Sequence, residues 1–182
     1  MALHPISQSF AMESRFTVQT GECKTANQLI ATLIGNGVLE SEDDLRSTRL
    51  PAIGCIQDVT TISGCVVTPF QFGNKCNPRF RNFYQQLSAH GFCFSAPEYA
   101  ALLVLQWLRQ LRTTGDCDLQ VYEHMIVLSQ PLPSGRTYHY PGAYDNLYFL
   151  RILRVPEGIH LKSTYYHLDH EIGLECPCLV SL

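Results

Sequence analysis

Residues 147–182 read LYFLRILRVPEGIHLKSTYYHLDHEIGLECPCLVSL. The apolar and β-branched runs in this stretch predict three short strands, over residues 147–155, 159–166 and 176–182. Pro156 and Gly158 separate the first two runs, and residues of this kind mark a turn. The second gap, residues 167–175, contains two His, one Asp and two Glu. Polar residues concentrated in one connection between strands are often the binding or catalytic ones, so we expect the functional site here.

The composition is typical of an ordinary globular protein. The 182 residues are enough for one domain with its own core, and 46% hydrophobic against 16% charged residues argues against an intrinsically disordered chain. The net charge is −3, and the Lys and Arg residues are scattered. Because a nucleic-acid partner requires a basic surface, binding to nucleic acid is not expected.

The sequence also lacks the usual membrane and export signals. The longest apolar run, residues 99–108, is about half the length of a membrane span and contains Gln106. The first residues lack the charged and apolar regions of a Sec-type signal peptide. Without such a signal, the eight cysteines are expected to be reduced thiols. The expected location is therefore the cytoplasm, or a host cytosol reached without a Sec signal.

Helical periodicity is concentrated in the first two thirds of the chain. Residues 1–20 are weakly patterned and are expected to form a loose arm. Asn77 followed by Pro78 predicts a helix start, and Ser95 with Glu98 three residues later forms a capping box. Together with the apolar spacing, these signals predict helices over residues 25–34, 42–48, 78–90 and 96–112.

Strand signals dominate the last third of the chain. Two or three further strands are predicted within residues 53–72, where Gly64 is one of the interruptions, and others over 92–94 and 121–128. A chain that places its helices first and its strands last favours an α+β fold over a doubly wound α/β fold. No linker is apparent, so residues 1–182 are expected to form a single domain whose sheet is rich in antiparallel pairs.

Asp169 and Glu171 are the two carboxylates that stand two residues apart in the second gap. In an extended segment, residues i and i+2 point the same way. Two carboxylates held close together could shift one another's pKa and act as a general base or as stabilisers of positive charge. The same spacing also occurs in solvated acidic loops that have no function.

Three segments resemble motifs of the mono-ADP-ribosyltransferases. Residues 150–158, LRILRVPEG, resemble the family's apolar strand followed by Val-Pro-x-Gly. Residues 166–174, YHLDHEIGL, resemble its aromatic-x-x-Glu/Gln-x-Glu loop, and residues 91–100, GFCFSAPEYA, resemble its Ser-Thr-Ser strand and the helix that follows. The resemblance implies an ADP-ribosyltransferase-like fold. It also implies a glycosyltransferase that moves ADP-ribose from NAD to a macromolecular acceptor. Bacterial toxins and effectors are among the proteins that catalyse this reaction.

The resemblance further implies roles for individual residues. Glu171 would hydrogen-bond the nicotinamide ribose and stabilise the oxocarbenium-like charge that develops as nicotinamide leaves. Asp169 would activate or orient the acceptor, and Tyr166 would contact it. Ser95 would support the ribose side of the NAD cleft. Arg49 is the early arginine that would bind the NAD phosphates through its fork geometry.

Other patterns compete with these assignments. The pair His90-Gly91, which lacks a following Thr, matches part of the His-Gly-Thr motif that one branch of the family uses instead of an early arginine. Cys76 and Cys93 precede predicted helix starts and could be nucleophiles, given a His and an Asp partner. A zinc site is the third alternative, but the ligand spacing matches no standard site, so no metal is expected. Its ligands would come from His160, His167, His170, Cys176 and Cys178.

The rival interpretation is a non-catalytic interaction domain, such as an adaptor, an inhibitor or an immunity protein. Aromatic residues around the end of the 130–142 loop would suit a surface for a protein partner. The two interpretations require different features. The enzyme requires an arginine, Ser95 and Glu171 to meet over one nucleotide-sized cleft, whereas the binding domain requires only an exposed apolar patch.

Overall fold

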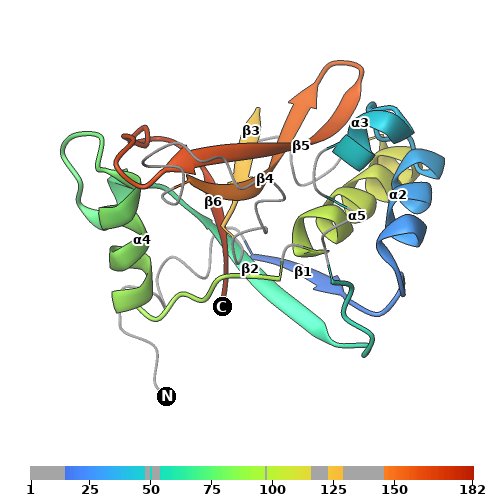
Figure 1. Cartoon of the computed structure of the whole chain (residues 1–182), viewed down its shortest axis with the longest axis horizontal. Coiled ribbons are helices and arrows are strands. Elements are labelled where there is room, and N and C mark those ends of the chain that lie inside the picture. The colour runs from blue at the N-terminus through green and yellow to red at the C-terminus, as the bar shows by residue number, and fades with distance from the viewer. Residues whose placement is uncertain (1–14, 48–49, 51–53, 97, 116–122, 129–145) are drawn as a thin grey trace, which may run out of the picture.

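The computed structural model describes residues 15–47, 50, 54–96, 98–115, 123–128 and 146–182. Its strands are β1 (Arg15–Gln19), β2 (Thr61–Val67), β3 (His124–Val127), β4 (Asn146–Val155), β5 (Gly158–His167) and β6 (Cys178–Ser181). They form one curled six-stranded sheet in the order β1-β2-β6-β3-β4-β5 (Figure 1). Neighbouring strands are antiparallel except β3 and β6, which are parallel.

Helices cover the sheet from both sides. Those of the described residues are α2 (Ala26–Gly35), α3 (Glu42–Ser47), α4 (Phe80–Ala89) and α5 (Glu98–Thr114), and a 3₁₀ turn spans Phe70–Phe72. Helices α2, α3 and α5 lie on one side of the sheet, and α4 lies on the other (Figure 1). None of these helices is long and apolar enough to cross a membrane.

The central strands alternate between two cores, one on each face of the sheet. In β2, Val66 belongs to the core shared with α5, whereas Cys65 and Val67 belong to the core shared with α4. Because neither face is solvated, such strands read as apolar runs without polar alternation, which is why residues 147–155 signal a strand so clearly. The other central strands are divided in the same way. The core shared with α5 contains Leu179 of β6, Val127 of β3 and Leu150 of β4. The core shared with α4 contains their neighbours Cys178, Val180, Ile126 and Phe149.

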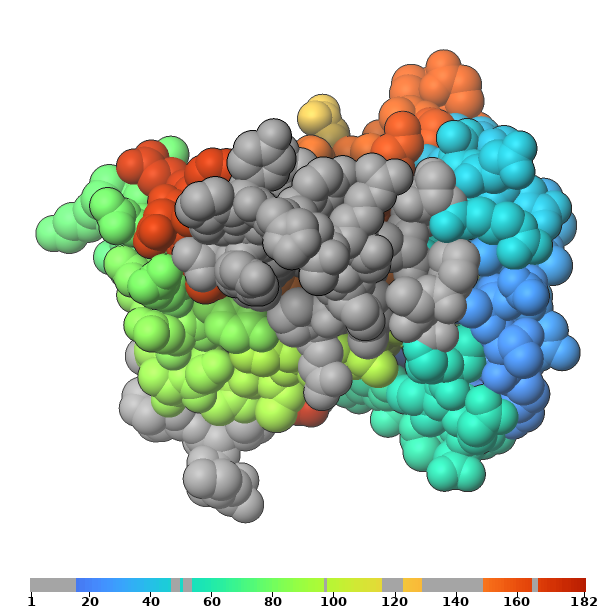
Figure 2. Space-filling view, in the orientation of Figure 1, coloured from blue at the N-terminus to red at the C-terminus, as the bar shows by residue number. Residues whose placement is uncertain are grey.

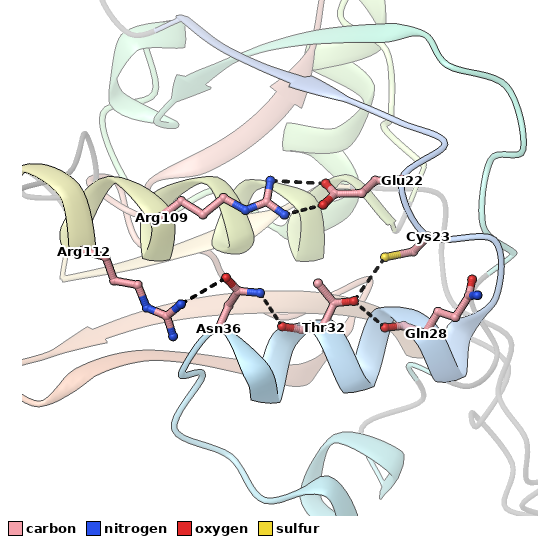
Figure 3. Close-up of polar contacts among 7 residues, drawn as sticks. All are labelled: Glu22, Cys23, Gln28, Thr32, Asn36, Arg109 and Arg112. Atoms are coloured by element: carbon pink, nitrogen blue, oxygen red, sulfur yellow. Dashed lines mark hydrogen bonds and ion pairs between the residues drawn. The ribbon is translucent and has the colours of Figure 1, made fainter.

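Polar contacts hold α5 against α2 and the segment that precedes it (Figure 3). Both terminal nitrogens of Arg109 contact the carboxylate of Glu22. Arg112 donates to the carbonyl oxygen of Gly35 over 3.2 Å and lies 3.5 Å from Asn36 Oδ1. A cation near the C-terminal carbonyls of a helix interacts favourably with the helix dipole. Because these groups are exposed, the contacts orient the two helices more than they stabilise the fold.

The α+β prediction is confirmed as a mixture of helix and sheet. The predicted helices agree with α2, α3 and α5, and the predicted final strands with β4, β5 and β6, to within two residues at each end. The strands are not confined to the last third of the chain, however. Strands β1 and β2 come from its first 67 residues and complete the sheet beside β6.

Two local predictions are wrong. Residues 15–19 are not part of a loose arm but form β1, because Phe16 is buried and packs edge-on against the ring of Trp107, with centroids 5.4 Å apart. Helix α4 begins at Phe80, and Asn77 does not cap it. The side-chain oxygen of Asn77 instead accepts a hydrogen bond of 3.1 Å from the N–H of Leu174.

Candidate functional site

The acidic connection between β5 and β6 is fastened to the segment that leads into α4 (Figure 1). Ile172 donates its N–H to the carbonyl of Pro78 over 2.9 Å, and Phe80 donates to the carbonyl of His170 over 2.8 Å. The side chain of Ile172 is buried in the core shared with α4. Backbone pairing and one buried side chain therefore hold this loop, and its acidic side chains are not needed for that purpose.

Asp169 and Glu171 are both exposed on this loop, whose red residues border the green ones before α4 in Figure 2. Asp169 lies in a turn closed by a 2.9 Å hydrogen bond from His170 N–H to the carbonyl of His167. Glu171 lies in extended backbone and pairs with Arg79 in a single β-bridge. The expectation of one extended segment is therefore wrong for Asp169, because the turn sets the direction of its side chain.

The two acids are exposed, and neither lines either of two cavities found in the described part of the chain. The described part of the chain contains cavities of about 630 Å³ at the β4–β5 turn and about 530 Å³ beside β1 and α5. Neither cavity is lined by Asp169 or Glu171.

Two arginines flank Asp169. Arg79 Nη1 lies 3.6 Å, and Arg81 Nη2 lies 3.7 Å, from Asp169 Oδ1. Both distances exceed a normal hydrogen bond, and all three side chains are 46% exposed or more, so the ion pairs contribute little to stability. These guanidinium groups can exchange Asp169 for an anionic ligand at little cost to the fold.

The carboxylate of Glu171 is the free acid of the site. Within the described ranges it forms no hydrogen bond and no ion pair, although its backbone is fixed by the bridge to Arg79. A positioned but unpaired carboxylate can accept a hydrogen bond from a ligand hydroxyl or stabilise a developing positive charge. Guanidinium groups beside it can bind phosphate oxygens.

Ser95 does not join this group of residues. It is buried, its N–H donates to the carbonyl of Leu128, and its hydroxyl shares a 2.5 Å hydrogen bond with that of Ser181 at the end of β6. The predicted capping box is also absent, because the carboxylate of Glu98 accepts from the N–H of Ile56 at 2.6 Å. Ser95 thus fastens the chain before α5 to β6.

Ser95→Ala is expected to lower the free energy of unfolding by about 1 kcal/mol, because it leaves the buried hydroxyl of Ser181 without a partner. Ser181→Ala should have an effect of similar size, and the double variant should lose less than the sum. Urea unfolding followed by circular dichroism measures all three. If Ser181→Ala unfolds at the same urea concentration as the wild type, the hydrogen bond between the two hydroxyls does not contribute to stability, and any effect of Ser95→Ala has another cause.

Two of the predicted site residues cannot be placed by their side chains. Arg49 lies outside the described residues. Tyr166 lies in β5 opposite Leu147 of β4, and only its backbone is described. The predictions made for these two residues therefore stay predictions.

Arg79 and Arg81 are the residues of the site that the sequence analysis missed. The Asn77-Pro78 signal assigned both of them to a helix, where residues two apart do not face one another. The available signal was the basic pair itself, Arg79-Phe80-Arg81, whose outer residues flank a buried Phe80. Nothing local in the sequence indicates that this pair meets a loop some 90 residues away.

The competing zinc pattern finds little geometric support, whereas the nucleophilic role of the exposed Cys76 and Cys93 stays a prediction. Among the described residues, no three His, Cys, Asp or Glu side chains are grouped as metal ligands. His160 pairs with Glu40 over 2.6 Å. A hydrogen bond with Cys178 lowers the pKa of the Cys176 thiol, and Arg151 lowers it further, against the effect of burial. Burial raises the pKa of the Cys178 thiol well above its usual value.

Comparison with known proteins adds no relative. The chain matches no family model, no curated protein and no solved structure.

Proposed function

We propose that the protein is an ADP-ribosyltransferase-like enzyme that transfers ADP-ribose from NAD to a macromolecular acceptor. The observation that carries the proposal is the position of Arg79 and Arg81, both within 3.7 Å of Asp169, with Arg79 also paired to the backbone of Glu171. The resemblance requires an arginine, Ser95 and Glu171 around one cleft. Of these requirements the arginine beside the acid pair supports the proposal, whereas Ser95 lies elsewhere, against Ser181. These two arginines take the place that the sequence analysis gave to Arg49.

Each group has a distinct task in this proposal. Arg79 and Arg81 bind the pyrophosphate of NAD, since paired guanidinium groups match phosphate oxygens bidentately. The unpaired carboxylate of Glu171 accepts a hydrogen bond from the nicotinamide ribose. As binding draws the arginines towards phosphate, Asp169 loses its two loose ion partners and becomes a free base for the acceptor.

The proposed reaction breaks one bond and forms one. The bond between C1′ of the ribose and the nicotinamide nitrogen breaks, and nicotinamide leaves with the electron pair. The positive charge that develops on the ribose is stabilised by Glu171. The nucleophile of the acceptor then bonds to C1′ and gives its proton to Asp169.

Seven cysteines in the described part of the chain are free thiols. An enzyme with free thiols would work in a reducing cytosol, either that of its own cell or that of a host. Such a location also supplies NAD and protein acceptors.

Glu171→Gln tests the proposal most directly. The amide keeps the shape of the side chain but removes the charge, so transfer of labelled ADP-ribose to acceptors in lysate should fall by at least roughly 100-fold. NAD should raise the melting temperature of this variant as much as that of the wild type, because the arginines remain. Arg79→Ala combined with Arg81→Ala should abolish that increase.

Glu175→Gln and Arg46→Ala are the matched controls. Glu175 is an exposed acid of the same loop, and Arg46 is an exposed arginine that forms an ion pair with Glu42 on its own helix. Both variants should keep wild-type transfer and NAD binding. Undiminished transfer by Glu171→Gln would remove this residue from the mechanism.

A non-catalytic interaction domain is the second candidate function. Phe70 favours it, because its side chain is 60% exposed while its N–H donates to the carbonyl of Leu174 in the acidic loop over 3.0 Å. An exposed aromatic side chain beside charged residues is a common feature of protein interfaces. If NAD changes neither the melting temperature nor the labelling of lysate, the interaction domain becomes the better interpretation.

A further inference from the structure

One cavity lies where α5, the start of β3 and the β4–β5 turn meet. Figure 2 shows the start of β3 and this turn along one edge of the molecule. The cavity volume of about 630 Å³ is within the usual range for sites of small organic ligands. Leu111, Leu153 and Val155 give it an apolar wall.

Arg151 is the residue that distinguishes this cavity. It lies on β4 opposite Ile126 of β3, and His124 is its diagonal neighbour on the same face of the sheet. The Nε atom of Arg151 is fully buried and has no hydrogen-bond partner. Within the described ranges, its guanidinium group forms no ion pair either.

The acids that line the cavity do not neutralise this charge. Glu123 and Glu157 are exposed, and neither lies within ion-pair distance of Arg151 or Arg154 in the described part of the chain. A partly buried charge without a partner lowers stability. Residues that lower stability in this way are commonly retained because they serve a function.

His124 contributes polarity without charge. Burial lowers its pKa, and the positive charge of Arg151 lowers it further, against a smaller opposite effect of Glu123. The imidazole is therefore neutral at pH 7 and can donate or accept one hydrogen bond. The charged residues that line the cavity are therefore Arg151, Arg154, Glu123 and Glu157.

We propose that this cavity binds a small organic oxyanion, a carboxylate or phosphate monoester with an apolar body. The oxyanion contacts the terminal nitrogens of Arg151, since the buried Nε is out of its reach, and forms a hydrogen bond with His124. The apolar body packs against Leu111, Leu153 and Val155. Glu123 and Glu157, exposed acids that also line the cavity, repel polyanions, so inorganic polyphosphates and nucleic acid are poor ligands.

Four probes define the chemistry of the ligand: benzoate, phenyl phosphate, inorganic phosphate and the uncharged benzamide. Each is titrated into the full-length, ¹⁵N-labelled protein, and amide shifts are followed by NMR. Benzoate or phenyl phosphate should shift the amides of residues 124 and 151–158, and the tighter of the two identifies the oxyanion. Benzamide and inorganic phosphate should bind roughly 10-fold more weakly or not at all, because each lacks half of the interaction.

Arg151→Met is the decisive variant because it keeps the apolar stem and removes the charge. It should weaken binding of the better probe roughly 10- to 100-fold, whereas Arg46→Met should leave binding unchanged. Since Arg151 has no ion pair to lose among the described residues, Arg151→Met should melt at the wild-type temperature or above it. Glu171→Gln should bind the probe normally, which separates this site from the proposed transferase site.

Two results would overturn the proposal. One is wild-type affinity of Arg151→Met for the better probe. The other is the absence of shifts around the cavity with both aromatic anions at millimolar concentration.

Discussion

Gly64→Ala should lower the free energy of unfolding by about 3 kcal/mol, a large effect for one added methyl group. A Cβ atom on Gly64 would lie 2.6 Å from Tyr99 Oη and 2.7 Å from the carbonyl oxygen of Val180. Neither oxygen atom can shift away easily. Tyr99 is buried and donates its hydroxyl to the carbonyl of Phe16 over 3.1 Å, and Val180 belongs to the central strand β6.

Gly54→Ala is the matched control, because a Cβ atom there meets nothing within 4 Å. Urea unfolding of the two variants separates the steric effect from the general effect of replacing glycine. The double variant Gly64→Ala/Tyr99→Phe should recover part of the loss, since it removes one of the two clashing oxygens. Equal urea midpoints for Gly64→Ala and the wild type would mean that Tyr99 of α5 does not lie close enough to Gly64 to exclude a methyl group.

Gly64 also illustrates what the sequence could and could not predict about the fold. Strands β4, β5 and β6 were predicted because their apolar runs and turn residues are local signals. The same rules treated Gly64 as an interruption between strands, whereas β2 runs through it from Thr61 to Val67. Glycine is required there because Tyr99 of helix α5 approaches the backbone of β2 closely. The residues next to Gly64 in the sequence do not indicate this contact.

The candidate site shows the same limit. The acid pair was found because Asp169 and Glu171 are close in the sequence. Their arginine neighbours were missed because Arg79 reaches the loop through backbone pairing between distant segments. Ser95 was assigned to a helix cap by a local motif, yet its partner Ser181 lies 86 residues away. Periodicity identifies elements, but long-range contacts decide which side chains meet.

Glu40→Ala should have an effect comparable to that of Gly64→Ala, about 3 kcal/mol, for an electrostatic reason. Glu40 is only 7% exposed. One carboxylate oxygen contacts His160 Nδ1 at 2.6 Å, and the other accepts the N–H of Leu161 at 3.1 Å. The next residue towards the N-terminus, Leu39, donates its N–H to the carbonyl of Ile159. Glu40 thus fastens the connection between α2 and α3 to the edge strand β5.

Removing this carboxylate leaves two buried or half-buried donors without an acceptor, which is the costly way to break such a contact. Glu42→Ala is the natural comparison. It removes the same charge two residues away, but its ion pair with Arg46 is exposed, so it should change stability by less than about 1 kcal/mol. The loss of stability in Glu40→Gln should fall between those of Glu40→Ala and Glu42→Ala, because the single oxygen of an amide cannot accept both of the hydrogen bonds that the carboxylate accepts. If Glu40→Ala and Glu42→Ala unfold at the same urea concentration, the buried contact with β5 does not hold this edge of the sheet.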